Sequence, residues 1–159
     1  MLMRFFTMEW WGGFQQSRSD DRPKTGASDD DIPKQYQAYF ESIRDKLPSA
    51  VAALNEANLH DSTLDLLRVN PSASRMELRV KMCDWTGAAG AFTATFEGVQ
   101  EVRFFSDPEQ SLPGPGGFGD LGYWEIDLAE DGYEFRALFS TGIEMAVRFS
   151  AVTTSISSE

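Results

Sequence analysis

The sequence predicts an α+β domain in which N-terminal helices pack on a roughly seven-stranded antiparallel sheet. Apolar residues recur at steps of three and four before residue 58, and at steps of two from Ser62 onward. Tight turns join most of the alternating segments, and such turns connect antiparallel neighbours because parallel neighbours need long crossovers. The helical segments all precede the strands, which is the order typical of α+β folds.

The chain has the length of one domain. Its 159 residues fall within the roughly 100–200 residues of a typical domain, and its 42% hydrophobic and 13% aromatic content can build a core. We expect a single domain over 1–159, with a helical part at 1–58 and a sheet part at 59–154. Segment 17–31 is polar, contains proline and glycine, and is expected to be a mobile loop.

Three helices are predicted in the helical part. Thr7 can cap a short helix over 8–16. The segment 32–47 is amphipathic, and its end is marked by Pro48, because the residue before a proline is pushed out of the helical region. Pro48 also opens the third helix, over 49–57. The apolar face of the second helix consists of Ile32, Tyr36, Tyr39, Phe40, Ile43 and Leu47.

Alternating apolar and polar residues predict the strands. In the segment 76–82, apolar residues alternate with Glu77, Arg79 and Lys81, which gives one dry and one wet face. Asp131-Gly132 is a strong hairpin signal. We interpret the tail from Ser155 as frayed. The expected strands cover 63–69, 76–82, 92–96, 99–105, 124–128, 133–139 and 145–149.

A long loop is expected between Ser106 and Gly122. Its Gly114, Gly116 and Gly119 spell G-x-G-x-x-G, but a phosphate-binding motif of this kind must open a helix, and here a strand follows. We therefore predict no phosphate site. Long loops are often functional, so this one, including Phe118, is a candidate partner-binding region.

The charge is strongly acidic. The net charge is −11, and residues 62–159 hold 15 acids against 7 bases. This balance argues against binding to nucleic acid, which requires Lys and Arg to neutralise phosphates, and against binding to an anionic membrane surface. A basic protein partner remains compatible with it, as does simple solubility.

Cysteine usage and hydropathy favour a cytoplasmic protein. The single cysteine, Cys83, excludes a disulfide framework and a cysteine metal cluster within the chain. No apolar run approaches the roughly 20 residues that span a bilayer. The apolar opening, Met1 to Phe14, contains Glu9 and lacks the basic flank and cleavage pattern of a signal peptide, so we expect it to be folded.

His60 and Asp61 are the candidate catalytic residues. His60 is the only histidine, and a carboxylate can orient such a base for proton transfer. Adjacent residues of an extended segment point to opposite sides, however, so the pair is not expected to form a dyad. We favour a structural role at the junction between helices and strands, with hydrolysis as the alternative.

The remaining candidate site residues are carboxylates and aromatics. Glu125 and Asp127 alternate with apolar residues, as do Glu134, Glu144, Arg136 and Arg148. Cross-strand ion pairs on a solvated face explain this pattern without chemistry, and no metal-ligand spacing or cofactor motif stands out. Trp10 and Trp11 can either anchor a partner or pack on the core, and we favour packing. The candidate partner-binding residues are Trp10, Trp11, Phe118, Glu125 and Asp127.

Four stretches of the chain resemble an uncharacterised bacterial family of unknown function, DUF4085. They are the opening Met3-Arg4-Phe5-Phe6-Thr7-Met8-Glu9-Trp10-Trp11, the junction Leu59-His60-Asp61-Ser62, Gly98-Val99 and Tyr123-Trp124-Glu125-Ile126. The resemblance implies no activity and no functional residues. Small sheet domains of this kind also look like the immunity proteins that neutralise bacterial toxins.

Function is therefore expected to be binding. The leading hypothesis is a non-catalytic protein-interaction domain for a basic partner, immunity-like in its sharpest form. The alternative is a small hydrolase or ligand-binding protein using His60 with a carboxylate. A third hypothesis is a homo-oligomer formed through an exposed sheet edge.

Overall fold

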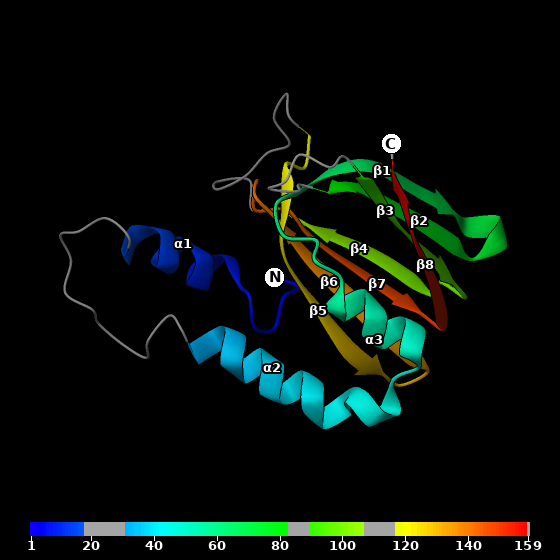
Figure 1. Cartoon of the computed structure of the whole chain (residues 1–159), viewed down its shortest axis with the longest axis horizontal. Coiled ribbons are helices and arrows are strands. Elements are labelled where there is room, and N and C mark those ends of the chain that lie inside the picture. The colour runs from blue at the N-terminus through cyan, green and yellow to red at the C-terminus, as the bar shows by residue number, and fades with distance from the viewer. Residues whose placement is uncertain (18–30, 83–89, 107–116, 159) are drawn as a thin grey trace.

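A computed structural model gives the fold of this chain and describes residues 1–17, 31–82, 90–106 and 117–158 (Figure 1). The predicted loop 17–31 lies outside these residues except for its two ends. Cys83, predicted as a structural thiol, also lies outside them, as do Gly114 and Gly116 of the glycine motif. Gly119 is followed by a strand, not a helix, as expected.

Three α-helices come first, close to their predicted positions. They are α1 (Met8–Ser17), α2 (Asp31–Ile43) and α3 (Ser49–Glu56). A 3₁₀ turn over Arg44–Lys46 follows α2 and ends before Pro48. None of these helices, within the described part of the chain, is long and apolar enough to cross a membrane.

Eight strands follow, and every pairing between them is antiparallel. Their order in the sheet is β4-β7-β6-β5-β1-β2-β3-β8. The bounds are β1 (Ser62–Asn70), β2 (Arg75–Met82), β3 (Gly90–Glu97), β4 (Glu101–Phe105), β5 (Asp120–Ala129), β6 (Gly132–Phe139), β7 (Glu144–Phe149) and β8 (Ala151–Ser158).

The count of seven strands is therefore one too low among the described residues, because β8 was not predicted: its second half, from Ser155, was interpreted as a frayed tail. This strand pairs with β3 along its whole length, from Glu97↔Ala151 to Gly90↔Ser158. Its side chains are exposed apart from Val152, so no apolar alternation marks it in the sequence. Cross-strand hydrogen bonding to β3, which is a tertiary contact, makes this segment a strand.

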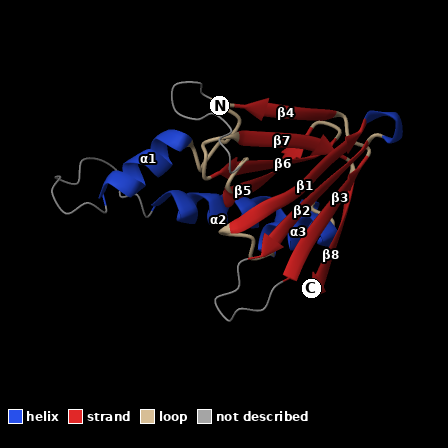
Figure 2. Ribbon diagram, turned by 90° about the horizontal axis from the view of Figure 1, so that it is seen from above, coloured by secondary structure: helices blue, strands red, loops and turns tan. Residues whose placement is uncertain are grey.

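The sheet curls so that its two halves face each other (Figure 2). β1 pairs with β5 at Ser62↔Leu121 and Thr63↔Asp120, and beyond that point the two strands separate. The core forms between the halves, where the Phe96 ring lies 5.7 Å from that of Phe135. The curled sheet thus encloses its own apolar face.

Glycine is required where the chain crosses between the halves, from β3 to β4. Gly98 has a φ of +60°, and a Cβ there would lie 2.0 Å from Ser150 Oγ. The Ser150 N–H donates to the carbonyl of Glu97 at 3.0 Å, which holds the β7–β8 crossing against the same corner.

Two helices cover the side where the halves separate. α3 contacts both β5 and β8 and buries Val51 and Leu54. α2 packs along β5 and buries Tyr36, Phe40 and Ile43. The predicted packing of N-terminal helices on the sheet is confirmed, and it places two tyrosines of α2 beside β5.

Candidate functional site

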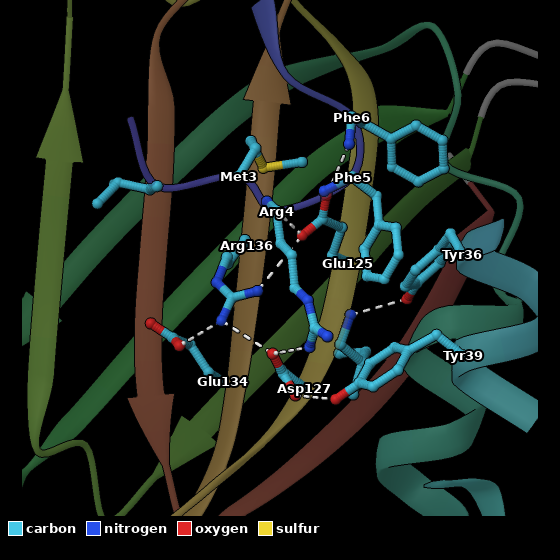
Figure 3. A network of polar contacts seen from close by, with 12 residues as sticks. Met3, Arg4, Phe5, Phe6, Tyr36, Tyr39, Glu125, Asp127, Glu134 and Arg136 are labelled. Carbon is cyan, nitrogen blue, oxygen red and sulfur yellow. Dashed lines mark hydrogen bonds and ion pairs between the residues drawn. The ribbon is translucent and has the colours of Figure 1, made fainter. Parts of the chain in front are cut away.

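The N-terminal segment crosses the polar face of β7, β6 and β5 (Figure 3). At β7, the backbone N–H groups of Leu2 and Met3 both donate to Glu144 Oε2, that of Met3 at 3.0 Å. The side chain of Met3 is buried. Glu144 therefore binds a stretch of backbone that has no strand partner.

Glu125 binds the next part of the segment in the same way. Three consecutive N–H groups donate to its carboxylate, from Arg4 at 3.0 Å, Phe5 at 2.6 Å and Phe6 at 2.8 Å. Carboxylates that accept several backbone N–H bonds form strong, charge-assisted contacts. The side chain of Phe6, which is 6% exposed, packs over the site, so Glu125 fastens the N-terminal segment to β5.

The expectation of a solvated face is wrong here. Glu125 and Glu144 are each 1% exposed, Glu134 is 6% exposed and Asp127 is 9% exposed. Alternation correctly placed these side chains on one face, but the apolar N-terminal segment covers that face. Glu125 and Asp127, which were among the candidate partner-binding residues, bind parts of their own chain.

Arg136 lies at the centre of the buried carboxylates. Its guanidinium reaches Glu125 Oε2 at 3.3 Å, Asp127 Oδ2 at 3.1 Å and Glu134 Oε2 at 2.8 Å. We call these four residues the Arg136 cluster. Burial acts to lower the pKa of Arg136, but Glu134 and Asp127 outweigh it, and the pKa lies above its ordinary value.

Two more arginines balance the charge of the Arg136 cluster. Arg4 Nη1 lies 3.5 Å from Asp127 Oδ2, and Arg103 pairs with Glu134. Three carboxylates thus face three guanidiniums. Among the described residues, no group of three or more His, Cys, Asp or Glu side chains could hold a metal ion.

Two tyrosines of α2 lie beside the Arg136 cluster, and Tyr39 contacts it directly. The Tyr39 hydroxyl donates to Asp127, and the Arg4 guanidinium stacks over the Tyr39 ring, 4.4 Å from its centroid. Burial raises the pKa of Tyr39, and the hydrogen bond to Asp127 adds to the rise. Helix, N-terminal segment and sheet are therefore coupled through one carboxylate.

Tyr36 closes the edge that β5 presents after β1 separates from it. Its hydroxyl accepts from the Ile126 N–H at 2.8 Å and donates to Asn55 Oδ1 of α3. Burial raises the pKa of Tyr36, and the nearby charges of Glu125 and Asp127 raise it further. A helix side chain thus replaces the missing strand as hydrogen-bond partner.

A second group of candidates converges on the ring of Tyr123. The ring centroids of Trp10, Trp11 and His60 lie 5.0, 6.2 and 5.3 Å from that of Tyr123, each in an edge-on arrangement. We call these four residues the Tyr123 patch. Trp10 and Trp11 pack against the core, which confirms the packing that the sequence favoured. Both side chains are only partly buried, so their exposed part can still contact a partner.

His60 and Asp61 form the contact that was not expected. His60 Nδ1 lies 3.1 Å from Asp61 Oδ1, with side chains 46% and 56% exposed. The expectation failed because Asp61 has a φ of +61°, and a left-handed residue does not alternate sides like an extended one. Its N–H donates to the carbonyl of Leu121 at 2.9 Å, which fixes the junction.

The hydroxyl of Ser62, the next residue in the chain, is buried. Ser62 follows the pair, but its side chain is fully buried, and its Oγ has no hydrogen-bond partner among the described residues. A nucleophile must be reachable by the substrate, and this one is not. Ser62 therefore cannot act as a nucleophile beside the His60–Asp61 pair.

Phe118 belongs to neither group. Its ring contacts Phe104 at 5.9 Å and Phe139 at 5.4 Å, measured between ring centroids, at the β4 side of the sheet.

Sequence reasoning missed three residues of these two groups. Tyr123 stands at the end of the predicted loop, and Tyr39 and Arg4 are distant in sequence from the carboxylate that they contact. The apolar opening Met3 to Phe6 was the available signal for a covering segment.

The model of the family described as a protein of unknown function, DUF4085, matches residues 18–148. The chain therefore belongs to this family, as the sequence resemblance indicated. No curated protein and no solved structure matches it significantly. The likeness to immunity proteins stays a prediction.

Proposed function

We propose that this DUF4085 member is a non-catalytic protein-interaction domain whose Tyr123 patch binds a basic protein. One observation carries the proposal: the patch gathers four aromatic rings from three separate stretches of chain, and two of these residues have an exposed carboxylate as their chain neighbour. Glu9 is exposed next to Trp10 in α1, and Asp61 is exposed next to His60.

The chemistry of the patch suits a Lys- or Arg-rich surface. Tryptophan and tyrosine are enriched among the residues that dominate binding energy, and their ring faces attract ammonium and guanidinium groups. Glu9 and Asp61 supply opposite charge at the rim. The net charge of −11 would also speed the approach of a basic partner and make its association rate salt-dependent. Neutralisation of a basic toxin, in the manner of an immunity protein, is the sharpest form of this proposal.

The Arg136 cluster supports binding over catalysis. Its carboxylates and that of Glu144 are occupied by guanidiniums and backbone N–H groups. General acid–base catalysis requires a carboxyl that can reach the substrate and exchange a proton with it. These groups are buried and paired, so their contribution is to hold the N-terminal segment that carries Trp10 and Trp11.

The test is affinity capture with matched charge variants. Wild-type protein is compared with Asp61→Asn, which the left-handed backbone tolerates because asparagine adopts positive φ readily. Glu130→Gln is the control, since Glu130 is exposed in the turn after β5, at the far end of that strand from Tyr123. We expect the capture of a stoichiometric basic protein. Salt should release it, Asp61→Asn should weaken its capture, and Glu130→Gln should leave its capture unchanged. Capture that responds equally to both variants, or not to salt, would contradict the proposal.

The His60–Asp61 contact favours one second candidate, a small hydrolase or ligand-binding protein. The 3.1 Å separation of Nδ1 and Oδ1 orients the imidazole as a general base requires. A panel of ester and amide substrates, assayed with wild type and His60→Gln, tests this candidate. Turnover that is lost in His60→Gln at an unchanged melting temperature would establish catalysis and refute a purely binding role.

A further inference from the structure

We propose that the outer edge of β8 pairs with β8 of a second copy of this chain, giving a two-fold dimer with one continuous antiparallel sheet. This interface is separate from the Tyr123 patch, which is built from α1, the α3–β1 junction and β5. It therefore goes beyond the proposed function and can stand or fall without it.

Within the described part of the chain, β8 is the last strand of the sheet and pairs with β3 alone. Its eight residues pair without a register shift, so its outer row of backbone N–H and C=O groups is long and regular. Natural edge strands avoid pairing with other molecules through charged side chains, prolines, bulges or shortness. The sequence of β8, AVTTSISS, has none of these protections.

The opposite edge is protected. β4 has five residues and carries Glu101 and Arg103, which pair with each other at 3.3 Å. A quarter of the whole chain is charged, and yet β8 holds no charge. The two edges of one sheet thus differ in length and in charge, and only β8 offers an unprotected template.

The lack of charge on β8 makes a second copy a suitable occupant of this edge. Two chains with a net charge of −11 repel each other over most of their surfaces, so a contact between copies needs an uncharged strip. A second β8 supplies one of equal length and identical chemistry. Opposed residues of an antiparallel pair share a face of the sheet, so one residue of β8 must lie opposite its own copy, with the two-fold axis between them. The two residues nearest the middle of β8 are Thr154 and Ser155, and each defines one possible register.

Either register covers the exposed apolar side chain of this edge. Ile156 is 69% exposed and lines a groove of about 420 Å³ between α3 and β8. An axis at Ser155 places it opposite Thr154 of the second copy, and an axis at Thr154 places it opposite Val152. Glu56, the charged residue of the groove, pairs with Arg44 at 2.6 Å, so it does not oppose the approach.

The decisive measurement is sedimentation equilibrium of the full chain between about 1 and about 100 μM, the range in which weak interfaces dissociate. We expect a monomer–dimer equilibrium in the wild type, a shift of at least about tenfold toward monomer in Ile156→Lys, and none in Phe104→Lys. Phe104, on β4, is 48% exposed and receives the same change at the other edge. A monomeric wild type, or a dimer that Ile156→Lys leaves intact, would overturn the proposal.

Hydrogen exchange of the wild type removes any dependence on how the variants fold. Amides of the segment 151–158 should exchange more slowly at the high concentration than at the low one, because pairing protects them. Amides of β4, 101–105, should exchange equally at both. Concentration-independent exchange in 151–158 would equally overturn the proposed interface, and protection confined to 101–105 would assign the dimer to the other edge.

Discussion

Two charged faces of the same sheet have opposite environments. On β1 and β2, Asp65 pairs with Arg79 at 2.5 Å, and the two side chains are 24% and 43% exposed. On β5 and β6, Glu125 pairs with Arg136 at 3.3 Å, and the two side chains are 1% and 13% exposed. Both faces arise from the same alternation of apolar and charged residues, and they differ in what covers them.

The difference matters because the energetics of an ion pair depend on water. Exposed pairs contribute little, since solvent screens the charges and the side chains lose entropy when they are held. A buried pair is costly to break, because the remaining charge is left without a partner or water. The faces of β1–β2 and β5–β6 should therefore respond very differently to the same substitutions.

The largest effect is expected from Arg136→Met. This change leaves the carboxylates of Glu125, Asp127 and Glu134 without their central guanidinium, and loss of one partner from a buried pair costs about 3–5 kcal/mol. Urea unfolding measures the free energy. Arg79→Met is the matched control on the exposed face and should change little. Equal losses in the two variants would mean that the covering of β5–β6 has no energetic consequence.

A smaller effect is expected from Glu125→Gln, which keeps the shape and removes the charge. Hydrogen bonds to charged groups contribute about 1.5–3 kcal/mol each. Glu125 accepts from Phe5 and Phe6 through one oxygen and from Arg4 through the other, and glutamine has a single acceptor oxygen, so one of these two sets of contacts is lost. We expect faster hydrogen exchange in residues 4–6. Asp65→Asn is the control and should leave that exchange unchanged. Unaltered exchange in Glu125→Gln would show that the segment is held by its apolar side chains alone.

Alkaline pH should weaken the β5 side in particular. The pKa of Tyr36 is raised from 10.0 by burial, so the unfolded chain loses this proton at lower pH than the folded one. The stability contributed by Tyr36 is therefore complete below pH 10 and declines above it, by at most about 1.4 kcal/mol per pH unit for one group.

Tyr36→Phe tests this pH dependence. It should cost about 1–2 kcal/mol at neutral pH, because the Ile126 N–H loses its acceptor, and it should flatten the decline above pH 10. Urea unfolding of both proteins between pH 8 and 11 gives the two slopes. Identical slopes would place the alkaline sensitivity elsewhere in the molecule.

The smallest effect is expected on the exposed face. The hydrogen bond from Arg79 and its charge, with that of Lys81, lower the pKa of Asp65. Arg79→Gln should therefore move the pKa of Asp65 back toward its ordinary value, which NMR of the carboxyl carbon can follow. Acid titration of Asp65 should leave the unfolding free energy almost unchanged, because the group is exposed. A large loss of stability would show that this face is coupled to the core.

Sequence reasoning predicted the local elements best. The steps of three and four within 32–47 predicted α2, and the hairpin turn at Asp131-Gly132 lies where it was expected. β8 was missed because Thr153 to Ser157 lack apolar alternation, and a strand defined by its neighbour leaves little trace in its own residues. The contact between His60 and Asp61 was missed because it depends on one left-handed residue.

The sequence by itself determined which side chains share a strand face and where the chain turns, because both follow from local backbone geometry. Only the tertiary structure decided which charged face is buried. The groups that cover Glu125 and Asp127 come from Phe5, Phe6 and Tyr39, between 88 and 120 residues away along the chain. Periodicity describes the two faces of a strand, but it carries no information about the distant segment that packs on one of them.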